Sequence, residues 1–169
     1  MEEPAALHCL GGFAMTMAYA VSRATADIDI LAVGSRETLA RLEKLAGRGS
    51  KLHSEFKVYI QPVGIVTYPE DYASRLMRMW PNFRLRKLKL YALEPHDLAL
   101  TKLERNSDVD RQDVLDLAAA GLLNPKTLRD RYAKEFRPNL VSGEKRHDLT
   151  LNLWIEMCWP PREIGDDAR

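Results

Sequence analysis

The sequence predicts an α/β fold, in which a small sheet flanked by helices is followed by a helical C-terminal part. Two observations predict the sheet: a short apolar run over residues 5–10 and an alternating stretch over 27–31 are both typical of strands. The residues between them, 13–20, are predicted to form a helix that follows Gly11 and Gly12. From Pro95 onward, apolar residues recur at helical spacing.

Length and composition favour one globular domain over 1–169, with an α/β core over 1–92 and the helical part over 93–169. No apolar run reaches the length of a membrane span, and the acidic start lacks the basic residues of a signal peptide. Cys9 and Cys158 lie at opposite ends and form no metal-ligand or disulfide pattern. We therefore expect a cytoplasmic protein with no membrane partner. Because the net charge is only +1, a polyanion would have to bind a local patch.

The strand predicted over 27–31 carries two carboxylates. Side chains at i and i+2 lie on one face of a strand, roughly 6–7 Å apart, so Asp27 and Asp29 converge on one side while Ile28 and Ile30 face the other. Two carboxylates at that distance repel each other unless a cation lies between them or one is protonated. Hard oxygen ligands suit Mg²⁺. Taken alone, such a pair more often belongs to a solvated edge strand with two exposed acids.

Gly11 and Gly12 stand between a predicted strand and a predicted helix. In that position the backbone lets phosphate oxygens approach free amides, and the helix N-terminus adds about half a positive charge. The alternative is a plain tight turn.

Further elements follow from periodicity and caps. Ser35 is a plausible N-cap for a helix that ends before Gly47. In the last predicted helix we expect Leu149, Leu153 and Trp154 to face inward. The remaining predictions are helices over 35–46, 68–78, 125–136 and 143–158 and a strand over 56–63.

Basic residues and aromatics alternate over 75–89, where Trp80 and Phe83 lie among arginines and lysines. This mixture suits single-stranded RNA or nucleotide phosphate. A solvated sheet face explains it equally well.

A second informative stretch runs from Glu94 to Leu117. Lys102 lies one turn past Leu98 on an apolar stripe, where a lysine either reaches solvent or meets an anion. Asp110 and Asp113 are three residues apart and share a helix face. The simpler interpretation makes Lys102 a surface lysine paired with Glu94 or Asp97, and makes Asp110 a partner of the helix dipole.

The order strand, Gly-Gly, helix and Asp-x-Asp resembles the nucleotidyltransferase superfamily. The fuller pattern GGFA…Tyr19…Arg23-x-Thr25-x-Asp27-Ile28-Asp29-Ile30, with the later DLALTKLER…D..DV, is similar to minimal bacterial nucleotidyltransferases that include the AbiEii-type toxins. The resemblance implies a nucleotidyltransferase-like small mixed sheet. It also implies nucleotide binding by Gly11, Gly12, Arg23 and Thr25, Mg²⁺ (or Mn²⁺) binding by Asp27 and Asp29, and catalytic roles for Lys102, Asp110 and Asp113.

The implied activity is metal-dependent transfer of a nucleoside monophosphate from an NTP to an RNA or protein acceptor. The same resemblance makes a toxin–antitoxin pair, with a cognate antitoxin as partner, the expected biological setting. The strand over 56–63 lacks the third carboxylate that this superfamily usually presents. The alternative is therefore a catalytically impaired relative that binds nucleotide, or an antitoxin or assembly subunit.

Overall fold

The computed structural model describes residues 5–21, 24–31, 35–83 and 85–161. It contains a mixed five-stranded sheet of order β3-β2-β1-β5-β4, which confirms the predicted α/β class. The strands are β1 (Ala5–Cys9), β2 (Asp27–Ile30), β3 (Tyr59–Pro62), β4 (Met77–Arg78) and β5 (Leu88–Ala92). The helices of the first part are α1 (Gly11–Tyr19), α2 (Arg36–Ala46), α3 (Lys51–Phe56) and the 3-10 helix η1 (Glu70–Arg75). Those of the second are α4 (Pro95–Leu100), α5 (Asp108–Ala119), α6 (Pro125–Arg131), the π-helix η2 (Tyr132–Phe136), the 3-10 helix η3 (Arg137–Asn139) and α7 (Glu144–Cys158).

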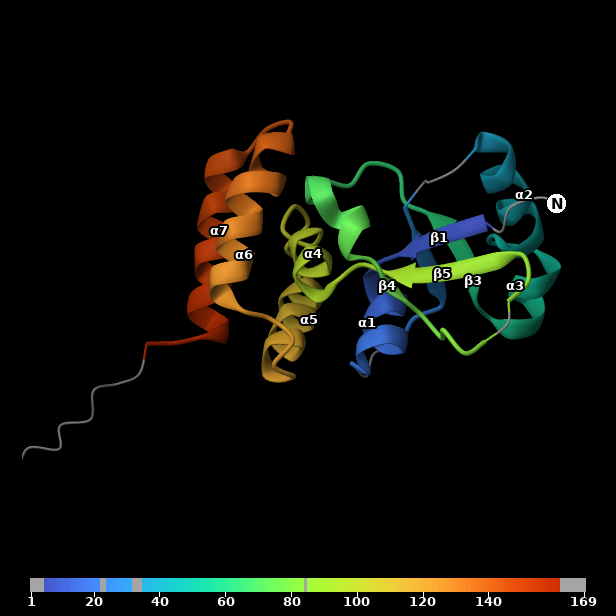
Figure 1. Cartoon of the computed structure of the whole chain (residues 1–169), viewed down its shortest axis with the longest axis horizontal. Helices are drawn as coiled ribbons and strands as arrows, with labels where there is room; N and C mark the ends of the chain where they lie inside the picture. The colour runs from blue at the N-terminus through green and yellow to red at the C-terminus, as the bar shows by residue number, and fades with distance from the viewer. Residues whose placement is uncertain (1–4, 22–23, 32–34, 84, 162–169) are drawn as a thin grey trace, which may run out of the picture.

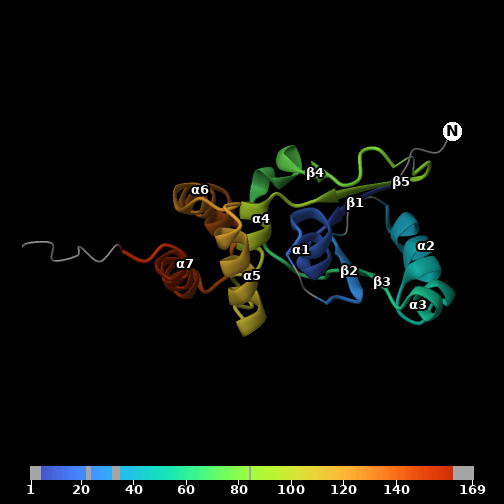
Figure 2. The same ribbon diagram turned by 90° about the horizontal axis from the view of Figure 1, so that it is seen from below.

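The elements follow one another along the long axis of the molecule. The helices α4 to α7 lie at one end, the sheet with α1 lies in the middle, and α2 and α3 lie at the other end (Figures 1 and 2). One continuous apolar cluster runs from Leu7 on β1 through Leu98 on α4 to Trp154 on α7. The helical part and the sheet therefore bury their apolar surfaces against each other.

Strand register divides the sheet into two faces. β1 pairs with β2 in antiparallel fashion at Cys9 and Ile30, and it pairs with β5 in parallel. Side chains alternate between faces along each strand. Leu7, Cys9 and Ile30 consequently share a buried face, whereas His8 and Asp29 belong to the opposite face.

Several element predictions were wrong in detail. The helix predicted over 68–78 is instead η1 followed by β4, because Met77 and Arg78 pair with Ala92 and Tyr91 of β5. The strand predicted over 56–63 is shorter, since α3 extends to Phe56. Tertiary pairing here overrides local helical periodicity.

The last helix also differs from its predicted orientation. Trp154 is buried, as predicted, but Leu149 and Leu153 are 65% and 62% exposed. The three side chains do not fit one face, because residues four apart lie together on a helix while the next residue turns away by about 100°. None of the helices that the structure describes is long and apolar enough to cross a membrane.

A buried ion network joins the sheet part to the helical part. The Asp97 carboxylate on α4 is fully buried and accepts hydrogen bonds from Arg75 at 2.8 and 3.1 Å and from Arg131 at 2.9 Å. Arg75 also donates to Glu135 at 2.6 Å. Because η1, α4, α6 and η2 all contribute, the network fixes the segment that follows β3 against the helices.

Candidate functional site

The bend between β1 and α1 brings the glycine pair against Asp29. The Leu10 amide donates to the Asp29 carbonyl at 3.0 Å, which fixes the start of the bend to β2. Gly11 has a φ of +64°, and a Cβ built there would lie 2.3 Å from Asp29 Oδ2. A residue without a side chain is needed to satisfy both conditions. The glycine bend and Asp29 therefore form one structural unit.

Asp27 lies on the same sheet face as Asp29, as the alternation along β2 requires. The Thr25 hydroxyl donates to Asp27 Oδ1 at 2.6 Å, which orients this carboxylate. Both aspartates are half-buried. Thr25 thus contacts the carboxylate pair directly, whereas Arg23 lies outside the described residues.

The partial positive charge at the N-terminus of α1 is not neutralised by side chains of that helix. Leu10 is the N-cap and makes no side-chain cap, and the first turn contains no acidic residue. Gly12 is buried within that turn. The partial positive charge of this helix end is therefore directed at the region of Asp29 and suits an anion such as phosphate.

Lys102 approaches the same region from the turn that follows α4. Its side chain is only 4% exposed, and its Nζ donates to Asp113 Oδ2 at 2.6 Å. Asp110 Oδ1 lies 3.7 Å from the same nitrogen. The structure thus brings together all three residues predicted in the second stretch, and it pairs Lys102 with Asp113 rather than with Glu94 or Asp97.

Asp110 is a buried and fully engaged carboxylate. It accepts two hydrogen bonds from Arg105, at 2.6 and 2.7 Å, and forms a capping box with Ser107 at the start of α5. Burial alone would raise the pKa of Asp110, but the bonds from Arg105 and Ser107 and the charge of Lys102 outweigh it and lower the pKa to about 2. The pKa of Arg105 is raised, first by its hydrogen bond to Asp110. Both groups are therefore charged at neutral pH.

These groups surround a cavity of about 240 Å³ at the junction of the sheet and the helical part. The sheet side contributes Leu10, Gly11 and Asp29. The helical side contributes Thr101, Lys102, Glu104, Arg105 and Asp110, and the loop after β3 contributes Val63, Ile65 and Val66. The described residues that line the cavity do not include Asp27, Gly12, Thr25 or Asp113.

Two polar residues of this cavity, Arg105 and Glu104, were not anticipated. They belong to the turn that follows α4, and this turn directs both toward the cavity. Glu104 Oε2 accepts from the Thr67 amide at 3.3 Å. Meanwhile the β3 residue in register with Asp29 is Gln61, so this strand position carries an amide in place of an acid.

No group of three or more His, Cys, Asp or Glu side chains among the described residues is arranged to hold a metal ion. Asp27 and Asp29 nevertheless offer hard oxygen donors from one strand face. Mg²⁺ is usually bound by one or two carboxylates together with waters and substrate phosphates rather than by a complete protein cage. The donor set therefore fits a metal that arrives with a nucleotide.

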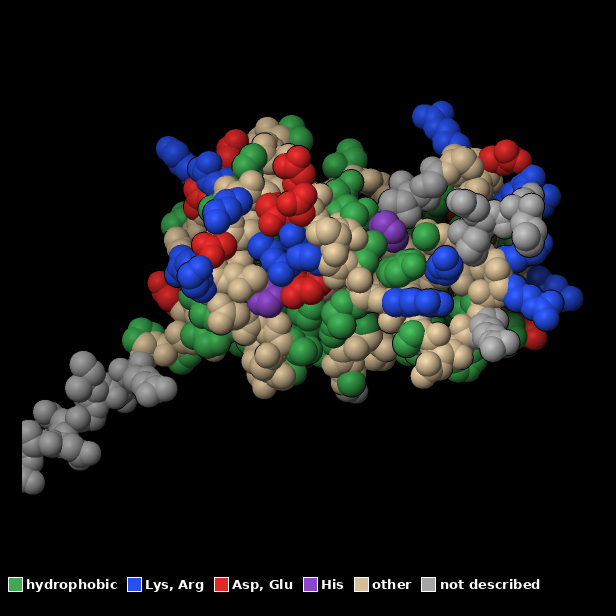
Figure 3. Space-filling view, in the orientation of Figure 1, with side chains coloured by type: hydrophobic (Ala, Val, Ile, Leu, Met, Phe, Trp, Pro, Cys, Tyr) green, Lys and Arg blue, Asp and Glu red, His purple; other side chains and the backbone are tan. Residues whose placement is uncertain are grey.

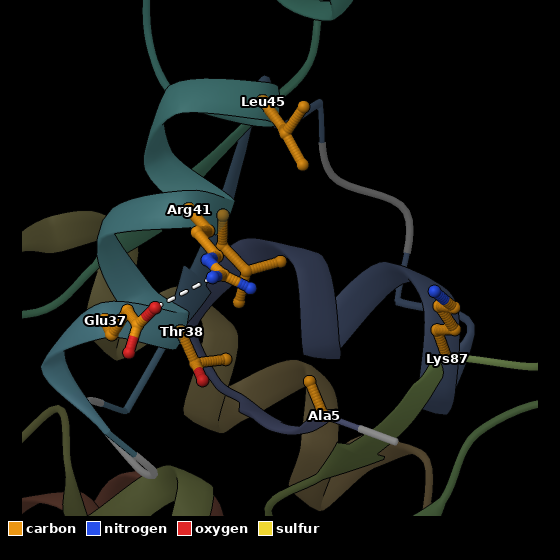
Figure 4. Close-up of a pocket in the computed structure, with 7 residues that line it drawn as sticks. Ala5, Glu37, Thr38, Arg41, Leu45 and Lys87 are labelled. Carbon is orange, nitrogen blue, oxygen red and sulfur yellow. Dashed lines mark hydrogen bonds and ion pairs between the residues drawn. The ribbon is translucent and has the colours of Figure 1, made fainter. Parts of the chain in front are cut away.

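A larger hollow of about 420 Å³ lies between α2 and the end of the sheet where β1 and β5 begin. Figure 4 shows Glu37 and Arg41, which form an ion pair at 2.8 Å, on one side and Ala5 and Lys87 on the other. Ala5 begins β1, whereas Gly11 follows the end of that strand. The hollow thus lies at the far end of β1, whereas Gly11, Asp29 and Lys102 line the smaller cavity.

A family model described as "Nucleotidyltransferase of unknown function (DUF6036)" matches residues 2–158. Searches among curated proteins and among solved structures each return no match. The match bears on the nucleotidyltransferase family as a whole and not on the AbiEii-type subgroup.

Proposed function

This chain belongs to that family of nucleotidyltransferases, and we propose that its cavity transfers a nucleoside monophosphate from an NTP to an RNA or protein acceptor. The observation that carries the proposal is the close approach of Gly11 to Asp29. It joins an anion-binding helix terminus to a carboxylate within one cavity, which is the minimum that phosphoryl chemistry needs.

In this proposal the triphosphate lies between the N-terminus of α1 and the cationic side of the cavity. Gly11 and Gly12 let the phosphates approach the backbone closely. Lys102, held by Asp113, and Arg105, held by Asp110, present fixed positive charges to the same space. Asp110 and Asp113 act as positioning residues, because their carboxylates are engaged by these cations.

Asp27 and Asp29 would hold the divalent metal that the family implies. When bound, Mg²⁺ would neutralise the triphosphate and stabilise the departing pyrophosphate. Thr25 orients Asp27 for this role through its hydroxyl. Arg23 belongs to the same set on the basis of the motif.

Glu104 is our choice for the group that accepts the acceptor's proton. The acceptor oxygen forms a bond to the α-phosphorus, the bond from that phosphorus to the β-phosphate oxygen breaks, and the hydroxyl proton passes to the Glu104 carboxylate. Asp110 is poorly suited to this step, because a carboxylate with a pKa of about 2 is a weak base near neutral pH. Glu104 lines the cavity and accepts one backbone hydrogen bond there.

The test is incubation of the full-length chain with each labelled NTP, Mg²⁺ and total RNA or protein, with transfer and pyrophosphate release measured together. Asp29→Asn and Asp27→Asn should abolish transfer, and Glu104→Gln should lower the rate. Asp116→Asn is the matched control, because Asp116 is a half-buried carboxylate on α5 whose described contact is Gln112. Transfer that survives Asp29→Asn would refute the proposal.

Gln61 favours a second candidate, a relative that binds nucleotide without transferring it. Calorimetric titration with Mg-NTP separates the two: binding without pyrophosphate release supports the binder. The toxin role, with an antitoxin partner, rests on the resemblance of the two motifs to AbiEii-type proteins. Growth arrest on induction that is lost with Asp29→Asn would support it.

A further inference from the structure

The sheet face that carries Asp29 has an exposed region on its other strands. By register, Lys89 and Tyr91 of β5, His8 of β1 and Arg78 of β4 all point to this face. Lys89 and Arg78 are exposed and the two rings are half-buried. Figure 3 shows this face, with basic side chains and a histidine beside hydrophobic ones over β1 and β5. We call these four residues the sheet track.

The charges near the sheet track are not committed to ion pairs. The segment 77–92 contains five Lys or Arg residues and no Asp or Glu. Some exposed basic residues elsewhere do form ion pairs, as Arg41 does with Glu37 and Lys126 with Asp130. Among the described residues, no ion pair is made by the four basic side chains Arg78, Arg86, Lys87 and Lys89. An uncompensated basic surface of this kind attracts a polyanion.

Aromatic rings lead from the sheet track toward the cavity. His8 makes edge contacts with Tyr91 and Tyr72, with centroids 6.1 and 5.7 Å apart, and its Nδ1 lies 3.1 Å from the Tyr72 hydroxyl. Tyr72 in turn contacts Tyr68 at 4.7 Å. Tyr68 directly follows Thr67, whose amide bonds Glu104 in the cavity. The row therefore connects β5 to the loop that lines the cavity.

We propose that the sheet track and the exposed ring of Tyr68, at the far end of this row, bind single-stranded RNA and guide it to the cavity as the acceptor. Bases stack on aromatic rings and phosphates meet lysine or arginine in sites that bind single strands. The strands are about 4.8 Å apart, so Tyr91 lies only two strand spacings, roughly 10 Å, across the sheet from the strand of Asp29. The binding surface follows from the residues of the track, and its role as acceptor site rests on the proposed function.

An acidic peptide would bind the basic side chains of the sheet track but would not stack on its rings. In a duplex the bases are paired and cannot stack on these rings. The measurement is fluorescence anisotropy of the full-length chain with a labelled unstructured oligoribonucleotide, a duplex of the same sequence and a poly-glutamate peptide. We expect a dissociation constant for the single strand in or below the roughly 10⁻⁴–10⁻⁶ M range of sequence-independent binding. A plot of the logarithm of this dissociation constant against the logarithm of the salt concentration should have a slope of magnitude about 2–3. Each phosphate contact contributes about 0.7 to this slope.

Variants separate charge from stacking. The double substitution Arg78→Gln/Lys89→Gln should weaken binding about tenfold or more and reduce the salt slope by about 1.4. Tyr91→Leu should weaken binding about fivefold or more, while Tyr91→Phe, which keeps the ring, should bind as the wild type does. Lys145→Gln is the matched control, because Lys145 is an exposed lysine on α7, at the helical end of the molecule and away from the sheet (Figure 1). Thermal unfolding verifies that each variant is folded.

Equal affinity for the duplex or the peptide, or wild-type affinity in the double variant, would overturn the proposal. Asp29→Asn should abolish transfer yet leave RNA affinity unchanged, and the track variants should leave Mg-NTP affinity unchanged. Track-dependent RNA binding by a chain that transfers nothing would overturn the proposed function while supporting this surface.

Discussion

Replacing Gly11 with alanine should displace Asp29 and thereby impair the site while leaving the fold intact. The new Cβ would lie 2.3 Å from Asp29 Oδ2 and 3.2 Å from its Cγ. The carboxylate must therefore retreat by about 1 Å, since ordinary contact begins near 3.4 Å. A misplacement of about 1 Å in a catalytic group can lower the rate about 100-fold. We expect a loss of at least that size in the transfer rate.

The cost in stability has two parts. An L-residue in the left-handed region costs about 1–2 kcal/mol, and forcing the Asp29 side chain away from its preferred rotamer adds about 0.5–1.5 kcal/mol. The free energy of unfolding should therefore fall by about 1.5–3.5 kcal/mol, measured by urea denaturation. In a chain of this length that corresponds to roughly 3–14 °C in Tm.

Gly121→Ala is the matched control for Gly11→Ala. Gly121 has a φ of +71° but no atom within 4 Å of a Cβ built there, so its substitution carries the backbone cost alone. The contact cost can then be isolated by repeating Gly11→Ala in an Asp29→Ala background, where it should largely disappear. The reasoning is refuted if Gly11→Ala and Gly121→Ala destabilise equally and both retain full transfer activity.

Three further predictions concern buried charge and helix orientation. Folding lowers the pKa of Asp110 from 3.8 to about 2, so its ionised carboxylate stabilises the fold by about 2 kcal/mol above about pH 4. This contribution is lost as the pH falls toward about 2. Asp110→Asn should remove this part of the pH dependence of the unfolding free energy, measured by urea titration at several pH values. Lys102→Met should cost about 3–5 kcal/mol, because it removes the cation that bonds the buried Asp113 carboxylate, and adding Asp113→Leu should recover part of the loss; equal stability of the two variants would contradict this coupling. On α7, Leu153→Gln should change stability by less than about 0.5 kcal/mol, whereas Trp154→Ala should cost about 3–5 kcal/mol, as thermal unfolding can show.

The order of β1, the glycine bend, α1 and β2 could be predicted because each signal is local. Alternation places Asp27 and Asp29 on one face, and a glycine pair after an apolar run indicates a bend. The Ser35 cap is local as well, and the structure confirms it: the Ser35 hydroxyl oxygen accepts from the Thr38 amide. Such features depend on neighbours within a few residues, so the sequence specifies them directly.

The features that could not be predicted depend on contacts between distant residues. The segment around Arg75 has the periodicity of a helix, but the helix ends at this residue. Arg75 is held by hydrogen bonds to Asp97 and Glu135, and the residues after Leu76 pair with β5. The same holds for Glu104. Its place in the cavity follows from a turn packed against Thr67, 37 residues earlier, and no local pattern indicates that contact.

The distribution of acids in this site explains how a nucleotidyltransferase cavity could work without the usual carboxylate on β3. Gln61 holds the position beside Asp29, so the strand contributes only an amide there. A carboxylate on the neighbouring strand would add repulsion to a pair that already requires a cation. Glu104 brings an acid to the cavity from the helical side, next to Arg105 in the sequence. In the proposed mechanism, β2 would bind the metal and the turn after α4 would accept the proton. The transfer rates of Gln61→Glu, Glu104→Gln and the double variant would therefore reveal whether a carboxylate at either position can accept the proton. If Gln61→Glu restores the transfer activity that Glu104→Gln removes, the two positions can exchange this role. A further loss of activity in the double variant would refute the exchange.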